Sequence, residues 1–310
     1  MHDDTSLTHG YTRREFGKLA LGSVSATALG IDAFSRALEA ASINSRFRGV
    51  QIGAITYSFR ALSDARAIVN AMASIGLGEV ELMSNHAEAL AGAPVGPNVA
   101  DALRAWRLRT TPGTWAPVRR IFVNAGIDLR SLCYNMNVKT FSDSDIEYGL
   151  TMAKHLGVKV MSTSTQVSMA KRVAPLADTH QILVAYHGHA NVQEPDEVST
   201  PESFATCLSY SKFHAINLDI GHFTAAGFDA AAYLREQHAR ITHLHLKNRK
   251  TPANGGANLP WGQGDTPIAG VLQLLSREKW DIPANIEFEY PGDPLLEVPK
   301  CLAFCQRALA

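Results

Sequence analysis

The chain has 310 residues, 46% of them hydrophobic, and its 29 basic and 29 acidic side chains cancel to zero net charge. This composition is typical of a soluble globular protein large enough to bury a substantial core. Without excess positive charge the chain has no electrostatic attraction for nucleic acid or for an anionic membrane surface, so we expect neither as a partner.

Residues 1–45 differ in composition from the rest. Arg13 and Arg14 are followed by Glu-Phe-Gly-Lys and by a weakly apolar run at 19–31 that is rich in Ala, Gly and Ser. That run is too short and too mild to span a bilayer as a stable helix. The segment resembles a twin-arginine export signal, with an ordinary amphipathic helix as the alternative. We therefore expect a signal segment and linker at 1–45, a catalytic domain at 46–310, and a periplasmic or otherwise exported protein without stable membrane anchoring. The cleavage point and the oligomeric state stay open.

From residue 49 onward, short β-like runs alternate with longer helical ones. Strands are predicted at 50–57, 79–83, 128–134 and 158–163, and four further runs end near His187, Asp219, His245 and Glu287. Helices are predicted at 64–75, 99–124, 142–156, 167–179, 201–211, 229–238, 268–278 and 296–308. Eight strand–helix pairs in roughly 260 residues predict an α/β fold, a single (β/α)8 TIM barrel. A doubly wound open sheet is the alternative.

The cysteines Cys133, Cys207, Cys301 and Cys305 lie in apolar context without the spacing of a disulfide framework, which predicts buried free thiols. Histidines cluster near the four last strands, but His214 precedes a strand at the opposite end and is predicted to lie on the surface.

The last four strands carry metal-ligand chemistry on one face. Successive residues of a strand point to opposite faces, so each of these runs has an apolar side and a polar side. Active sites of TIM barrels lie at the carboxyl ends of the strands, where these polar residues fall. The polar sides are formed by His187 and His189, Asp219, His243, His245 and Lys247, and Glu287 and Glu289.

These strand ends also carry recognisable motifs: Asp219-x-Gly-His222, His243-x-His245-x-Lys247, Ile286-Glu287 and a Gly-Gln-Gly-Asp-Thr-Pro-Ile run at 262–268. In this order they resemble the sugar phosphate isomerase/epimerase family of xylose-isomerase-like TIM barrels, over residues 49–308. The resemblance implies one divalent metal ion held by Asp219, His245 and Glu287. Where the family has a fifth-strand Glu, this chain has His187 or His189. The expected cofactor is therefore one ion of Mn, Co, Zn, Fe or Mg.

The resemblance implies a metal-dependent sugar isomerase or epimerase. Such an enzyme removes a proton next to a carbonyl, and the metal stabilises the resulting enediolate. The candidate catalytic residues are Glu289, Lys247 and Glu81, with Glu289 and Lys247 preferred. Two alternatives stay open: a metal-dependent lyase or hydratase that acts by β-elimination on a keto-sugar or 3-keto-glycoside, and a non-catalytic sugar-binding protein.

The expected partner is a small carbohydrate. Residues predicted to bind it are His222, His86, Arg249, Trp261 and His243. Each has a structural alternative: His243 could hydrogen-bond a neighbouring strand, Glu81 could form an ion pair, and Trp261 could fill a loop.

Overall fold

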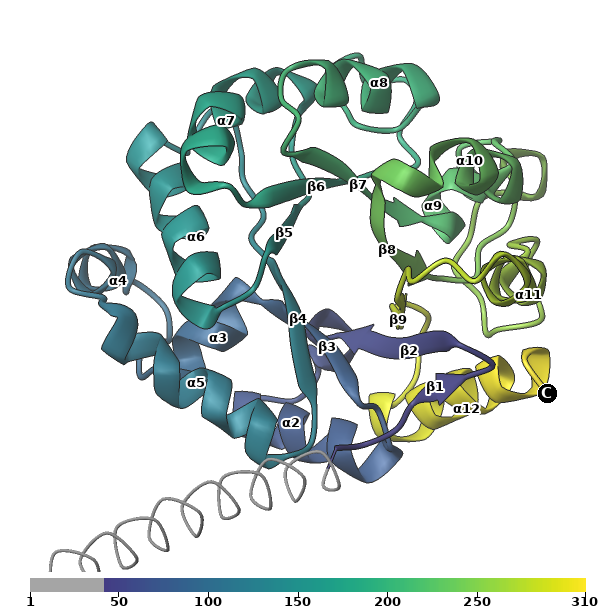
Figure 1. The fold of residues 1–310 in the computed structure, drawn as a ribbon, viewed down its shortest axis with the longest axis horizontal. Coiled ribbons are helices and arrows are strands. Elements are labelled where there is room, and N and C mark those ends of the chain that lie inside the picture. The colour runs from purple at the N-terminus through teal and green to yellow at the C-terminus, as the bar shows by residue number, and fades with distance from the viewer. Residues whose placement is uncertain (1–41) are drawn as a thin grey trace, which may run out of the picture. The chain divides into compact units, whose positions relative to one another are not determined.

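A computed structural model describes residues 42–310, of which 43–310 form one compact unit. Its parallel strands form a closed ring, because Ile52, Gly53 and Ala54 of the first barrel strand pair with Ala284, Asn285 and Ile286 of the last. The strands are β2 (Val50–Ile55), β3 (Glu79–Met83), β4 (Asp128–Cys133), β5 (Val160–Thr163), β6 (Leu183–His187), β7 (His214–Asp219), β8 (Ile241–Leu246) and β9 (Ala284–Ile286), with β1 (Arg46–Phe47) antiparallel to β2 (Figure 1). The predicted (β/α)8 barrel is confirmed, and the open-sheet alternative is wrong.

Helices surround this ring (Figure 1). They are α2 (Ala65–Ile75), α3 (Ser84–Leu90), α4 (Ala100–Arg107), α5 (Pro112–Asn124), α6 (Asp143–Leu156), α7 (Val167–His180), α8 (Pro201–Ser209), α9 (Ile220–Ala225), α10 (Ala230–Gln237), α11 (Ile268–Glu278) and α12 (Pro294–Ala308), with short 3-10 turns η1 (Thr56–Phe59), η2 (His238–Arg240) and η3 (Pro252–Asn254). Within residues 42–310 none of the helices combines the length and apolar character that crossing a bilayer requires. The predicted export signal lies outside the described residues, apart from its last few positions.

Side-chain caps explain where several helices begin. Asp64, Ser142, Thr200, Asp229 and Asp293 each accept a hydrogen bond from a backbone N–H in the first turn of the helix that follows. The single helix predicted at 99–124 is two helices instead. Thr111 begins α5 with a capping box and Pro112 occupies its first turn, which separates it from α4.

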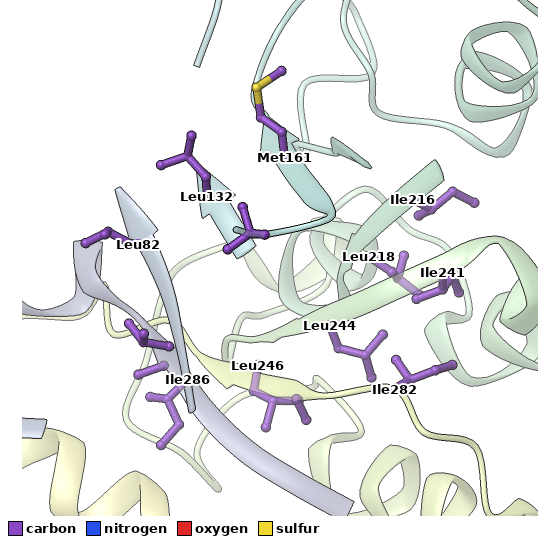
Figure 2. Packing of buried hydrophobic residues seen from close by; sticks show 14 of the residues in the cluster. Leu82, Leu132, Met161, Ile216, Leu218, Ile241, Leu244, Leu246, Ile282 and Ile286 are labelled. Atoms are coloured by element: carbon purple, nitrogen blue, oxygen red, sulfur yellow. The ribbon is translucent and has the colours of Figure 1, made fainter. Parts of the chain in front are cut away.

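The apolar core lies between the strands and the helices. Figure 2 shows outward-facing side chains of the strands, among them Leu82, Leu132, Met161, Ile216, Leu218, Leu244, Leu246 and Ile286, all fully buried. Burying one such side chain contributes roughly 1.5–3 kcal/mol.

His214 belongs to this outer layer, so its predicted surface position is wrong. Its Nδ1 lies 2.7 Å from the carbonyl oxygen of Cys207, and its Nε2 lies 3.2 Å from the Tyr186 hydroxyl, because α8 covers this side of β7. The predicted free, buried cysteines are confirmed.

The inside of the barrel is polar, whereas TIM barrels are usually filled by branched apolar side chains. Buried polar residues point inward from six strands: Glu79, Glu81, Ser131, Ser162, Asn217, His243, His245 and Asn285. Gly53 of β2 makes room for one of them, because a Cβ there would collide with the carboxylate of Glu79. Burial raises the pKa of Glu79 to about 8. The barrel therefore encloses a carboxyl group that is protonated at neutral pH.

The buried Glu79 should make the fold more stable in mild acid than in mild alkali. Its ordinary pKa is 4.5 and its folded pKa is about 8, so between these values only the unfolded chain releases the proton. The free energy of unfolding should therefore fall as pH rises through this window. In Glu79→Gln it should fall by less, because the variant has no carboxyl group at this position. Urea unfolding from about pH 5 to about pH 9 measures the effect, with the exposed Glu236→Gln as the control. Parallel pH dependence in wild type and Glu79→Gln would contradict it.

Candidate metal centre and substrate cavity

A cavity of about 270 Å³ opens at the carboxyl ends of the barrel strands. Four strands end beside it: His187 is the last residue of β6, Asp219 is the last residue of β7, Lys247 follows β8, and Glu287 follows β9. The lining comprises Ile55, Tyr57, Met83, Cys133, Asn135, Ser164, His187, His189, Asn217, His222, His245, Lys247, Glu287 and Glu289. The predicted position at the strand ends thus brings histidines, carboxylates and a lysine into one enclosed space.

Three of the lining residues, His187, His245 and Glu287, form a potential metal-binding group together with the buried Asp219. One nitrogen or oxygen atom from each of His187, Asp219, His245 and Glu287 lies within 4.8 Å of the other three. His187 Nε2 is 3.4 Å from Asp219 Oδ2 and 3.8 Å from Glu287 Oε2, and His245 Nδ1 is 3.1 Å from Glu287 Oε2. Ligands at about 2.0–2.2 Å from one ion lie about 3–3.6 Å apart, so these spacings suit a single divalent ion.

The surroundings of two buried atoms support the same assignment. His187 Nε2 and Asp219 Oδ2 are buried and make no well-directed hydrogen bond. Asp219 Oδ1 is already used, because it accepts the backbone N–H of His222 at 2.7 Å and caps α9. Asp219 Oδ2 has the Lys247 ammonium 3.1 Å away as an ion-pair partner, whereas His187 Nε2 has no such cation. A buried polar atom without a hydrogen bond is costly, and a metal ion between these two atoms would satisfy both. Two imidazoles and two carboxylates are also a suitable donor set for a divalent ion.

Glu81 lies below this group, inside the barrel. Its Oε2 is 2.6 Å from His245 Nε2 and 3.2 Å from His243 Nε2, while Ser162 donates a short hydrogen bond to Oε1. Burial alone would raise the pKa of Glu81, but the two histidines lower it well below its usual value. Glu81, predicted as a catalytic candidate, therefore contacts His245 and does not line the cavity. This contact leaves His245 Nδ1 facing the other ligands.

Lys247 is the central cation of the cavity. Its Nζ lies 2.8 Å from Glu289 Oε2, 2.9 Å from Glu287 Oε2 and 3.1 Å from Asp219 Oδ2. Burial alone would lower the pKa of Lys247, but these three carboxylates raise it above its usual value. The buried ammonium is therefore charged at neutral pH.

His222 lies between two cations. Its Nε2 is 2.9 Å from Lys247 Nζ, and its Nδ1 is 2.6 Å from Arg249 Nη1. Burial and the charge of Lys247 hold the pKa of His222 well below its usual value, so the ring is neutral. Arg249 also donates to the carbonyl oxygen of Gly256, which ties the loop after β8 to His222.

The other residues predicted from the sequence lie apart from the four-residue group. His189 lines the cavity, but its Nδ1 is bound to Glu197 Oε1 at 2.5 Å. His86 Nδ1 is 2.9 Å from Thr56 Oγ1, outside the cavity lining. Trp261 packs edge-on against Phe304, with ring centroids 5.7 Å apart, and lines a different hollow.

Several polar residues of the cavity, among them Asn217, were missed by the sequence analysis. Tyr57, Asn135 and Ser164 each follow a barrel strand within two residues. Asn135 Oδ1 accepts the backbone N–H of Ser164 at 2.8 Å, and Ser164 Oγ lies 3.2 Å from His187 Nδ1. Their position just after strands β2, β4 and β5 was the available signal, because that is where TIM barrels place functional side chains.

The closed ring of parallel strands, with a polar cavity at their carboxyl ends, defines a TIM-barrel protein. Residues 133–307 match the family described as xylose isomerase-like TIM barrel. This match covers more than half of the chain, and the chain belongs to that family.

Solved structures show the same fold. A probable 3-DHS dehydratase, AsbF from Bacillus anthracis, aligns with a TM-score of 0.60 and 16% identity over 82% of this chain and 99% of its own. A sugar phosphate isomerase/epimerase from Parabacteroides distasonis gives 0.60 and 17%, over 83% and 94%. The IOLI protein with a bound zinc atom gives 0.59 and 13%, over 84% and 96%. A comparison with curated protein sequences finds no match. At these identities the structural likeness shows the fold alone.

Glu81 should be required for tight metal binding. Without it, His245 loses the carboxylate that orients its ring, so Glu81→Ala should weaken metal affinity by about 10- to 100-fold. Chelator competition measures this affinity. Glu88→Gln is the control, because Glu88 is also buried but is bound to Arg107 and Tyr148 on the outer side. Unchanged affinity in Glu81→Ala would refute the role.

Proposed function

We propose that the protein is a divalent-metal-dependent sugar isomerase or epimerase that removes a proton from the carbon next to a carbonyl. The observation that carries this proposal is the Lys247–Glu289 pair, which lines the cavity beside the four metal-ligand candidates. One carboxylate and one ammonium outside the ligand group are the functional groups that moving a proton between carbon and oxygen requires. Two findings support this reaction class: the chain belongs to the xylose isomerase-like TIM-barrel family, and a sugar phosphate isomerase/epimerase is among its structural neighbours.

His187, Asp219, His245 and Glu287 would hold the ion. A bound dication supplies electrostatic stabilisation of the negative charge that develops on the oxygens of the sugar. The mixed imidazole and carboxylate donors suit Mn, Co, Zn, Fe or Mg, and the bound zinc of one structural neighbour is consistent with this range.

Glu289 is the base in this proposal. Its side chain is about one-fifth exposed and faces the cavity, so it can reach a bound substrate. Lys247 holds it at 2.8 Å and is charged, which lets the same ammonium donate to a substrate oxygen when the proton is removed. Tyr57, Asn135 and Ser164 offer hydroxyl and amide groups around the remaining cavity wall, and these suit the hydroxyl groups of a sugar.

The size of the cavity supports a small substrate. Sites for drug-sized ligands have volumes of about 300–1,000 Å³. This cavity, at about 270 Å³, lies just below that range, which favours one sugar ring over a longer chain. The chain's zero net charge does not favour a nucleic-acid substrate.

A metal-dependent lyase is the second candidate, and one observation favours it. In the described cavity Glu289 is the sole carboxylate that does not belong to the ligand group, whereas an epimerase that works on both faces of a carbon needs two proton-transfer groups. Glu289 as base and Lys247 as acid would suffice for β-elimination, in which a leaving oxygen takes a proton. A probable dehydratase is also among the structural neighbours.

Metal-loaded protein should exchange carbon-bound hydrogen of its substrate with solvent. We would incubate it with a panel of sugars and 3-keto-glycosides in deuterated water, and follow the products by NMR and mass spectrometry. Deuterium on carbon without bond cleavage supports the isomerase or epimerase, and a released aglycone or enone supports the lyase. Glu289→Gln should lose about 100-fold or more of either activity. Absence of exchange and of product across the panel would favour a non-catalytic sugar-binding protein.

Lys247→Met should separate metal binding from catalysis. Removing the ammonium leaves Asp219 and Glu287 with less positive charge nearby, so metal should bind about tenfold more tightly or better. Turnover should nevertheless fall by about 100-fold, because the acid is lost. Chelator competition and steady-state kinetics test the two effects. Lys250→Met, on the loop after β8 and paired with Asp265, is the control. Weaker metal binding in Lys247→Met would contradict this arrangement.

A further inference from the structure

A second cavity, of about 480 Å³, lies at the amino-terminal ends of the barrel strands. We call it the amino-terminal cavity. Its lining contains strand-start residues, such as Glu79 of β3, Leu183 of β6, His214 of β7 and Ile241 of β8, so it lies at the opposite end of the barrel from the candidate metal centre. This face of a TIM barrel usually serves stability, and a polar cavity there needs its own explanation.

Two irregularities in the sheet place side chains in this cavity. Between β3 and β4 the register skips Arg130, because Val80 pairs with Leu129 and Glu81 pairs with Ser131. An extra residue of this kind bends its strand and re-aims its side chain, and Arg130 lines the cavity. The bulge therefore delivers a guanidinium group to the amino-terminal cavity.

The second bulge lies between β7 and β8. Ile216 pairs with Ile241 and Asn217 pairs with His243, so Thr242 is the extra residue. Thr242 also lines the cavity, and its Oγ1 lies 2.8 Å from His243 Nδ1. Two separate bulges at the same end of the barrel thus add a cation and a hydroxyl group to one cavity.

The charges of the cavity do not balance. Its cations are Arg130, Lys212 and Arg240, and Asp281 is paired with Arg130 at 3.2 Å. Asp281 is also bound at 3.1 Å by Arg46, which does not line the cavity. The positive charge of Arg46 offsets the negative charge of Asp281. Within residues 42–310, no carboxylate lies within 4.0 Å of the charged groups of Lys212 or Arg240. Arg240 donates to the carbonyl oxygen of His214 at 2.6 Å, and Lys212 Nζ lies 5.4 Å from the centre of the Phe213 ring. Two cations are therefore available to a ligand.

The remaining carboxyl group does not cancel this positive charge. Glu79 lines the cavity, and its side chain is buried inside the barrel. Its Oε2 makes no hydrogen bond. Because burial raises the pKa of Glu79 to about 8, the group is a neutral hydrogen-bond donor at neutral pH. The amino-terminal cavity therefore combines cations and donors, which suits a ligand that carries negative oxygens.

We propose that the amino-terminal cavity binds a small oxyanion, a carboxylate or a phosphate group, at the face of the barrel opposite the candidate metal centre. Arg130 and Arg240 present planar groups that match two oxygens of such an anion, and Lys212 adds a point charge at the rim. The proposal is independent of the reaction proposed above.

Isothermal titration calorimetry of the full, metal-free chain tests the proposal. Inorganic phosphate and citrate are titrated separately in a buffer that contains neither. Saturable binding of one molecule per chain is expected for at least one of them, and the arm that binds identifies the class of anion. Lys212→Gln and Arg240→Gln should each weaken this binding by about tenfold. Arg235→Gln, an exposed arginine of α10 outside the lining, is the matched control and should bind as wild type does.

A further variant separates this cavity from the candidate metal centre. Asp219→Asn alters the candidate metal centre and should leave anion binding unchanged. Absence of saturable binding in both arms would overturn the proposal. Binding that is equal in wild type and Lys212→Gln, or that is lost in Asp219→Asn, would also overturn it, because the anion would then lie elsewhere. Lys212 is exposed, so its variant tests binding without a demand on folding.

Discussion

The imidazole of His245 is held between two buried carboxylates, and the arrangement of the candidate site depends on this contact. Nε2 faces Glu81 from inside the barrel, and Nδ1 faces Glu287 at the mouth. With both nitrogens engaged, the ring cannot rotate without breaking a charge-assisted hydrogen bond. The polar interior of the barrel is thereby connected to the cavity: Glu81 is anchored by Ser162 and His243, and through it the inner layer of side chains fixes the direction of one metal-ligand candidate.

Most of the fold could be predicted because the strands and helices carry clear periodicity. The strands agree to within a few residues, since apolar and polar residues alternate along them and loops separate them. The errors have local causes. The split between α4 and α5 depends on Thr111 and Pro112, a helix start inside a stretch of helical composition. The short helices α3 and α9 were missed because they begin directly after a strand, where a loop was expected.

The candidate site divides in the same way. Asp219, His245 and Glu287 could be predicted to face one space because strand parity and strand ends determine that face. The choice between His187 and His189 could not be made from parity, which is the same for both. It depends on β6 ending at His187, after which Gly188 packs so closely on Phe204 that a Cβ there would collide. The depth of a side chain in the barrel is equally invisible to alternation, and this is why Glu81 and His243 were expected in the cavity.

The polar lining of the barrel has a consequence for how the protein can change. A barrel core of carboxylates, imidazoles and amides tolerates few single replacements, because each removal leaves a buried partner unsatisfied. Concerted replacement by well-packed apolar residues of similar volume is often neutral or stabilising. A hyperstable version of this scaffold is therefore accessible to design through several simultaneous exchanges, and it would lose the inner support of His245. Thermal robustness and chemistry compete here for the same few positions.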